Sequence, residues 1–147
     1  MSFKNLPEVK RKIRKRLTKD AMKNLDKAIE RSSRHVANVA RDSILSGNRS
    51  GLTYMRGGKQ HTASARGEPP ASDTGTLASS ITNRVKRTTT GIVGEVSASA
   101  DDGSGGNYAV HLEFGTSNMD ARPFMVPALN KSARRVKTIF KQEGIIR

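Results

Sequence analysis

The feature that most constrains the fold is an apolar pattern that runs through the first third of the chain. Apolar or small residues recur there at every third or fourth position, which predicts one amphipathic helix over residues 6–46 with a stripe facing a core. The stripe consists of Leu6, Val9, Ile13, Leu17, Ala21, Leu25, Ile29, Ser32, Val36, Val39 and Ser43. A helix of about 40 residues is about 60 Å long. That exceeds what a compact domain needs, so the helix either breaks near residues 18–20 or projects and packs on a neighbour.

Positive charge is concentrated at the two ends of the chain, whose net charge is +14 over 147 residues. Residues 1–50 hold 14 basic and 5 acidic side chains, residues 51–130 hold 7 of each, and residues 131–147 hold 6 and 1. Such an excess attracts nucleic acid or an acidic protein surface. The densest cluster consists of Lys10, Arg11, Lys12, Arg14, Lys15, Arg16 and Lys19. It either follows DNA phosphates or is a solvated helix face that matches an acidic partner, and no interleaved aromatic residue supports base stacking.

The composition predicts a thin hydrophobic core. Apolar residues are 34% of the chain, aromatic residues are 4%, and Trp is absent. Because aromatic side chains supply much of the bulk of a core, neighbouring subunits are expected to contribute stability. The absence of Cys excludes disulfides and thiolate chemistry. No apolar run approaches the roughly 20 residues of a membrane span, so we expect a soluble intracellular protein that makes no membrane contact.

The rest of the chain predicts an α+β fold in a single domain. Residues 47–76, rich in Gly, Pro, Ser and Thr, predict an extended arm that is mobile until a partner orders it. Alternation over 81–87 and 91–98 predicts two strands joined by a turn at 88–91. Residues 108–114 fit a third strand with Tyr108, Val110, Leu112 and Phe114 on one face, although they also fit a helical turn.

Residues 123–143 predict a closing helix with Pro127 in its first turn. Its expected buried stripe is Leu129, Ala133, Val136 and Phe140. The predicted architecture is a long basic helix (6–46), an arm (47–76), and a unit (77–147) in which this helix packs on a small antiparallel sheet of about three to four short strands.

No residue pattern supports catalysis, a bound metal or a cofactor. His111 and Glu113 form an H-x-E, but the zinc deaminases that use it also need a P-C-x-x-C. Asp101 and Asp102 lie in a Gly-rich stretch that is typical of a turn. The glycines at 103–106 do not form a nucleotide-binding loop. We therefore expect a protein that works through contacts and not as an enzyme.

Two stretches together carry a resemblance to a known family. The first is A-R-G-E-P-P-A-S-D-T-G-T-L at residues 65–77, followed by Ser80 and Ile81. The second is Y-A-V-H-L-E-F-G-T at residues 108–116, followed by A-R-P-F at 121–124 and P-A-L at 127–129. In this order after a long basic helix, they resemble the neck and tail-component family of lambda-like siphophages, which comprises head–tail joining and tail-completion proteins. One departure is Arg66, at a turn where the family usually carries Pro.

The residues of these stretches have plausible structural roles. Asp73 and Thr74 are expected to cap a short helix from Leu77 to Ile81, and Gly75 and Gly115 to permit tight turns. A Glu113–Arg122 ion pair and the extended backbone before Pro123 would present Phe124 as an anchor. Phe114, Phe124 and Leu129 either form the small core or lie at an interface. The predicted assembly residues are Tyr54, Asp73, Thr74, Gly75, Leu77, Glu113, Phe114, Gly115, Thr116, Arg122, Pro123 and Phe124.

The resemblance implies a virion protein of the neck that assembles in the host cytoplasm and joins head to tail. The implied partners are further copies in a ring of six or twelve, a head-closure or connector protein, and a tail terminator or tube protein, with non-specific contact to genomic DNA. A ring contact joins two different surfaces of the subunit. Two alternatives stay open: a tail terminator at the same junction, and a DNA-binding protein that uses the basic cluster.

Overall fold

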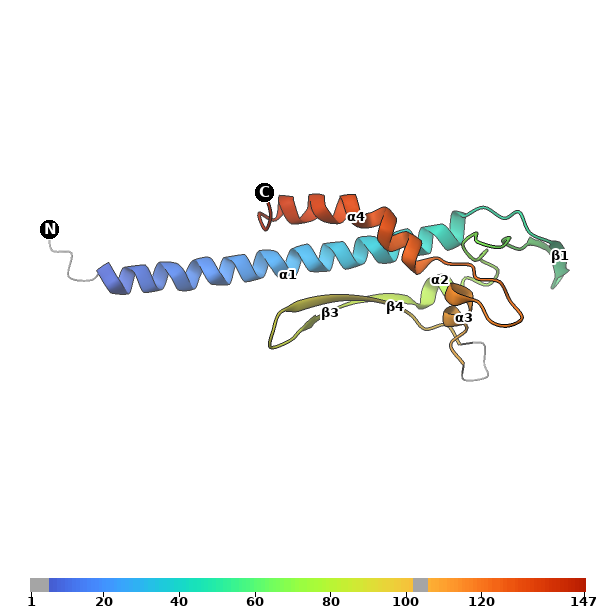
Figure 1. Ribbon diagram of the computed structural model, residues 1–147, viewed down its shortest axis with the longest axis horizontal. Coiled ribbons are helices and arrows are strands. Elements are labelled where there is room, and N and C mark those ends of the chain that lie inside the picture. Colours follow the sequence, from blue (N-terminus) through green and yellow to red (C-terminus); the bar gives the residue numbers. More distant parts are fainter. Residues whose placement is uncertain (1–5, 102–105) are drawn as a thin grey trace.

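A single long helix dominates the molecule, whose computed structural model describes residues 6–101 and 106–147 (Figure 1). Helix α1 (Leu6–Ser46) is continuous over 41 residues. It confirms the predicted helix and its end before Gly47, and it excludes a break at residues 18–20. The N-terminal part of α1 extends past all the other described elements, whereas the C-terminal half is packed against them (Figure 1).

Two strands run alongside the packed half of α1. Strands β3 (Ile81–Arg87) and β4 (Ile92–Ala98) pair antiparallel, with Val85 opposite Gly94. Thr88 closes their turn, since its N–H donates to the carbonyl of Gly91 at 2.7 Å. Both predicted strands and the turn between them are confirmed. Arg87 donates to Asp26 at 2.6 Å, which holds the turn end of the hairpin on α1.

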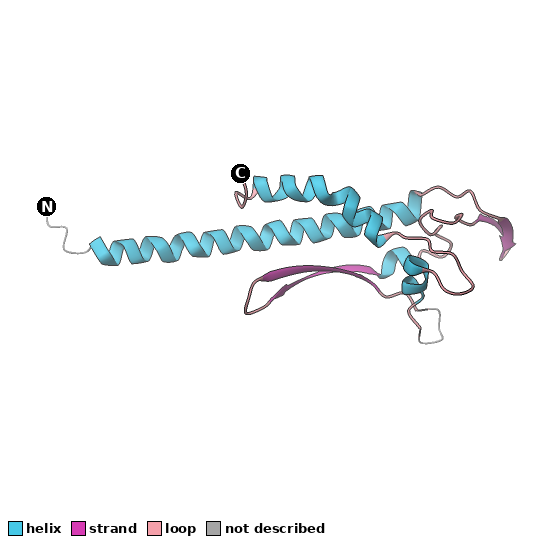
Figure 2. Cartoon of the chain, in the orientation of Figure 1, coloured by secondary structure: helices cyan, strands magenta, loops and turns pink. Residues whose placement is uncertain are grey.

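The predicted arm contains a hairpin of its own. Strands β1 (Thr53–Arg56) and β2 (Lys59–Thr62) pair antiparallel and lie beyond the C-terminal end of α1 (Figure 1). Gly57 and Gly58 make the turn with φ of 56° and 75°, a conformation that two-residue hairpin turns require and glycine adopts freely. The four strands therefore form two separate two-stranded sheets and not the single sheet that the sequence predicted (Figure 2).

The arm is tied to the rest of the chain at several points. The N–H of Ser72 donates to the carbonyl of Ile44 at 3.2 Å. Glu68 accepts from the hydroxyl of Ser50 at 2.6 Å and from the backbone N–H groups of Ala65 at 2.8 Å and Ser50 at 3.2 Å. These hydrogen bonds, that from the Ser50 hydroxyl foremost, lower the pKa of Glu68. The arm thus has regular structure and specific anchors, unlike the extended segment that was predicted.

Residues 108–114 form a helix, α3 (Tyr108–Phe114), which confirms the helical alternative and excludes the strand that the sequence also allowed. Asn107 caps this helix, accepting from the N–H of Ala109 at 3.2 Å, and its side chain also bonds the backbone of Ala98 and Ala100. The buried positions of α3 are Ala109 and Glu113, four residues apart as on one helix face. The alternating apolar residues suggested a strand, but the residues that the fold buries are the small Ala109 and the charged Glu113. The neighbouring predicted loop lies partly outside the described residues.

The last helix, α4 (Met125–Gln142), matches the predicted helix over 123–143, but it packs along α1 instead of on the sheet as predicted. Its buried residues are Ala128, Ser132 and Ile139, whereas the predicted stripe residues Leu129 and Ala133 are exposed. The stripe was thus misplaced by one residue. Small side chains at the contact let two helix backbones approach closely, which leaves the larger apolar residues at the edge of the interface.

The core is thin, as the composition predicted, and it lies where α1, α3, α4 and the short helix α2 (Thr76–Ser80) meet. Six of its ten buried residues are alanines, and the larger members are Ile44, Leu77, Ile81 and Phe124. Such a core buries little apolar area per residue, and burial is the main stabilising contribution to folding.

Candidate assembly surface

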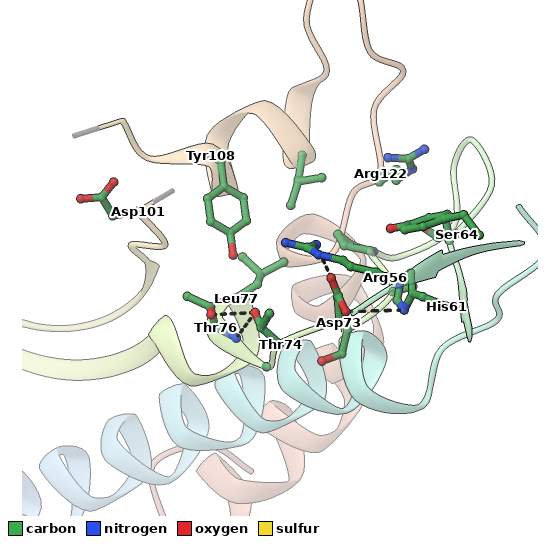
Figure 3. Close-up of a pocket in the computed structure, with 17 residues that line it drawn as sticks. Arg56, His61, Ser64, Asp73, Thr74, Thr76, Leu77, Asp101, Tyr108 and Arg122 are labelled. Carbon is green, nitrogen blue, oxygen red and sulfur yellow. Dashed lines mark hydrogen bonds and ion pairs between the residues drawn. The ribbon is translucent and has the colours of Figure 1, made fainter. Parts of the chain in front are cut away.

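Six predicted assembly residues from distant parts of the sequence line one cavity of about 470 Å³. Figure 3 shows this cavity between the β1–β2 hairpin, the segment before α2, and α3. The six residues are Tyr54, Asp73, Thr74, Gly75, Leu77 and Arg122. The fold therefore brings together two stretches that the sequence analysis had treated as separate motifs.

An ion-pair cluster ties the hairpin to the segment before α2. The guanidinium of Arg56 donates to the carboxylate of Asp73, and Nδ1 of His61 lies 3.9 Å from the same carboxylate (Figure 3). The rings of Tyr54 and His61 meet edge to face with their centroids 5.3 Å apart. Asp73 is thus committed to the hairpin and does not cap α2, contrary to the sequence prediction.

Arg56 and His61 are functional candidates that the sequence analysis missed. The adjacent glycines Gly57 and Gly58, flanked by alternating residues, were a hairpin signal that could have placed Arg56 and His61 on one face with Tyr54.

The chain turns at Gly75 directly before α2, and the tight turn predicted there is confirmed by its left-handed φ of 79°. Gly75 occupies the N-cap position, where it offers no side chain to the helix. The hydroxyl of Thr74 takes part of this role, because it accepts from the N–H of Thr76 at a long 3.4 Å. Leu77, one residue further on, points into the core.

The carboxylate of Glu113 organises the start of α4. It is 8% exposed and accepts from three backbone N–H groups: Phe124 at 2.8 Å, Met125 at 2.9 Å and Val126 at 2.9 Å. The free N–H groups of a first helical turn and the helix dipole both favour a carboxylate there. Glu113 therefore joins α3 to α4 across eleven residues of chain.

Arg122 is joined to α3 through its backbone. Its N–H donates to the carbonyl of Leu112 at 2.7 Å, but no ion pair joins its side chain to Glu113 in the described parts of the chain. The predicted Glu113–Arg122 pair is therefore wrong. Nε of Arg122 is buried without a hydrogen-bond partner among the described residues, beside the cavity.

Gly115 and its neighbours turn the chain from α3 towards α4. Gly115 has φ of 76°, and a Cβ added to it would lie 2.9 Å from the carbonyl oxygen of Met119. Thr116 closes the next turn, because its N–H donates to the carbonyl of Met119 at 2.8 Å. The tight turn predicted at Gly115 is confirmed, and Pro123 follows in a half-buried position.

Phe114, Phe124 and Leu129 were predicted to lie either in the core or at an interface, and the structure assigns them to different places. Phe124 is 1% exposed and is the largest fully buried side chain, so it belongs to the core. Phe114 is 75% exposed and Leu129 is 58% exposed, so both lie at the surface of the single chain.

The basic cluster surrounds the projecting part of α1. All seven of its residues are exposed, and Lys12 pairs with Glu8 at 2.9 Å. At 100° per residue these basic residues occupy every side of the helix except the one that carries Val9, Ile13 and Leu17. The cluster is therefore a charged sleeve with one apolar strip, and not a single flat basic face.

The residues considered for catalysis do not form a site. His111 is exposed on α3, whereas the carboxylate of Glu113 accepts hydrogen bonds from backbone N–H groups at the start of α4. No group of three or more His, Asp or Glu side chains that could hold a metal ion occurs in residues 6–101 and 106–147. Asp102 lies outside the described residues. Within the described ranges, no helix is both long and apolar enough to cross a membrane.

The fold and this surface define a small α+β protein in which polar groups such as Glu68, Asp73 and Glu113 hold loops and helices in place. The sequence matches the family described as "Bacteriophage HK97-gp10, putative tail-component" over residues 2–115. This match covers most of the chain, and the protein belongs to that family. It is thus a structural component of a phage tail, and its place is in the virion. Comparisons with curated proteins and with solved structures gave no match.

Proposed function

We propose that the protein is a neck or tail-completion subunit that forms a ring between the DNA-filled head connector and the tail. The observation that carries this proposal is the projecting part of α1, in which every residue from 8 to 23 is exposed. In proteins most helical stability comes from tertiary packing of an amphipathic face, so an unpacked helical segment of this kind suits a subunit whose neighbours cover it. The thin, alanine-rich core supports the same reading.

The proposed partners follow from the two ends of the subunit. The β1–β2 hairpin and the cavity beside it lie at the opposite end from the projecting helix (Figure 1). Two ends of different chemistry suit a part placed between a head-closure or connector protein and a tail terminator or tube protein. We propose a ring of six or twelve copies, in which the basic sleeve on α1 would make non-specific contact with passing DNA.

The test is a lysate of a phage whose gene for this protein carries a stop codon, imaged by negative-stain electron microscopy. The proposal predicts complete heads and complete tails that remain separate, and joined particles when the wild-type protein is supplied in trans. Joined virions in the absence of the protein would refute it. Tails of uncontrolled length would instead identify the tail terminator, the alternative role at the same junction.

A DNA-binding protein remains the second candidate, because seven basic side chains are exposed on one helix. This function predicts tight binding of duplex DNA by the purified chain, with the logarithm of affinity falling by about 0.9 per phosphate contact for each unit of log salt. The neck function predicts weak binding without sequence preference. Fluorescence anisotropy with a labelled duplex at several salt concentrations separates the two.

A further inference from the structure

An apolar groove of about 440 Å³ opens where α1, β4 and α4 meet. None of the residues that line it is charged. Apolar side chains make up most of the lining, among them Ile29, Val36, Met125, Leu129, Val136 and Phe140. Leu129, Val136 and Phe140 are three of the four residues predicted to form the buried stripe of α4, and they line one wall of the groove. No described residue of the same chain fills it.

The same chain carries an apolar stripe that no other part of the described chain covers. Val9, Ile13 and Leu17 follow each other at intervals of four residues on the projecting part of α1, and about half of each side chain is exposed. Spacing of this kind forms one continuous ridge, the feature that packs between the ridges of another helix. Charged side chains flank the ridge on both sides.

The chain cannot cover this stripe by itself. Each step of four residues advances the pattern by about 40° around the helix, so from Val9 to Ile29 it turns by roughly 200°. The stripe therefore faces nearly the opposite side of α1 from the residues that pack on β3, β4 and α4. Because α1 is one continuous helix, the stripe cannot fold back onto a groove that the same helix helps to form.

Stripe and groove match in chemistry and in length. From Val9 to Leu17 the stripe measures about 12 Å along the axis. The groove extends about 10 Å along α1 and about 22 Å along α4, at the same rise per residue. We propose that this groove receives the Val9–Ile13–Leu17 stripe of a second copy of the chain. The proposal rests on the proposed ring function and names the two surfaces that make the ring contact.

This contact is heterologous, because a helix of one copy meets a groove of the next. Each copy then still offers a free stripe at one side and a free groove at the other. Such contacts produce a closed ring when the rotation between copies closes, and a filament when it does not. A reciprocal two-fold dimer is not expected from this geometry.

Electrostatics gives the contact a distinctive response to salt. Each chain carries a net charge of +14, and the groove lining offers no acidic side chain to the basic sleeve around the stripe. Copies therefore repel each other while the apolar surfaces attract, so added salt should strengthen self-association by screening the repulsion. Binding to DNA or to an acidic partner would weaken with salt.

The test uses two single substitutions, Ile13→Arg on the stripe and Leu129→Arg in the groove, in the full chain. Sedimentation velocity is expected to show that the wild-type chain associates and that each variant is monomeric, with dissociation constants raised roughly 30-fold or more as for interface hot spots. A mixture of the two variants should form a 1:1 dimer and nothing larger. Only the stripe of the Leu129→Arg chain and the groove of the Ile13→Arg chain are then intact.

Matched controls and a covalent readout make the outcome decisive. Thr18→Arg and Thr138→Arg add the same charge on the opposite faces of α1 and α4, and both should associate like the wild type. Because the chain lacks Cys, an Ile13→Cys chain mixed with a Leu129→Cys chain should form a disulfide dimer under mild oxidation, and Thr18→Cys should not. Circular dichroism verifies that all variants are folded.

The proposal is overturned if the wild-type chain stays monomeric at high salt, if the two Arg variants do not complement each other, or if Thr18→Cys cross-links as well as Ile13→Cys. These results are independent of the stop-codon lysate. Separate heads and tails together with failed complementation would retain the neck function and refute this contact alone.

Discussion

The three hydrogen bonds that Glu113 accepts predict a large loss of stability when its charge is removed. Replacing Glu113 by Gln keeps the length of the side chain but converts one oxygen into an NH2 group that faces the N–H groups of α4. At least one of the three backbone donors then loses its acceptor, which costs about 1–3 kcal/mol for a buried group. The lost attraction between the carboxylate and the helix dipole adds about 0.3–1 kcal/mol. The expected total is about 1–4 kcal/mol.

Urea unfolding followed by circular dichroism measures this cost, at a protein concentration below that of self-association. A loss of about 1–4 kcal/mol lowers the midpoint by roughly 0.5–2 M when the slope is near 2 kcal/mol per M. A change of this size is a large part of the total stability of an ordinary domain.

The matched control is Glu30→Gln, which removes an exposed carboxylate that pairs with Arg34 one turn away on α1. Pairs of this kind contribute about 0.3–0.5 kcal/mol, so the midpoint should hardly move. If Glu113→Gln were as mild as Glu30→Gln, the idea that this carboxylate fixes the start of α4 would be incorrect.

Three further changes probe the turn, the arm and the core. Gly115→Ala should lower stability by about 1–3 kcal/mol in thermal unfolding, because alanine disfavours the left-handed backbone and its Cβ meets a backbone oxygen. The pKa of Glu68 lies below its usual 4.5, chiefly because of the Ser50 hydroxyl, so its contribution to stability is present above that value and is lost as pH falls through the lowered pKa. Glu68→Gln should therefore flatten the acid side of the stability–pH curve. Phe124→Ala should cost about 3–5 kcal/mol in urea unfolding as a core cavity.

Each of these has a control at a related position. Gly91→Ala should be nearly neutral, since no atom lies within 4 Å of its added Cβ. Phe114→Ala should change the stability of the monomer by less than about 0.5 kcal/mol, because its side chain is mostly in solvent. The corresponding argument would be contradicted if the Phe114 and Phe124 variants lost equal stability, or if the Gly91 and Gly115 variants did. The argument for Glu68 would be contradicted if Glu68→Gln left the acid side of the stability–pH curve unchanged.

Local signals in the sequence predicted most of the secondary structure. Examples are the repeating apolar pattern of α1, the alternation in β3 and β4, and the turn residues between these strands. Each of these signals involves only residues close together in the sequence, so it can be recognised from the sequence alone. The sequence did not decide between strand and helix at α3, because the burial of Ala109 and Glu113 depends on contacts with distant segments. It also placed the buried face of α4 one residue away, because close helix packing selected Ala128 and Ser132 over larger neighbours.

The candidate surface was predicted only in part, for a related reason. Tyr54, Asp73 and Arg122 were named as separate residues, but their meeting around one cavity depends on the tertiary path of the arm. The role of Glu113 at α4 likewise requires two segments eleven residues apart to approach. Apolar residues spaced by four move gradually around a helix, and this rotation is not obvious from the sequence pattern. That Val9, Ile13 and Leu17 face away from the core becomes clear only when the helix is known to be continuous.

The most direct test of the central claim is a cryo-electron microscopy reconstruction of the head–tail junction of the virion that contains this protein. The account predicts a closed ring of copies at that junction, with the N-terminal part of α1 of each copy lying against α4 of the next. A virion whose junction contains no copy of the chain, or whose copies lie elsewhere in the tail, would contradict it.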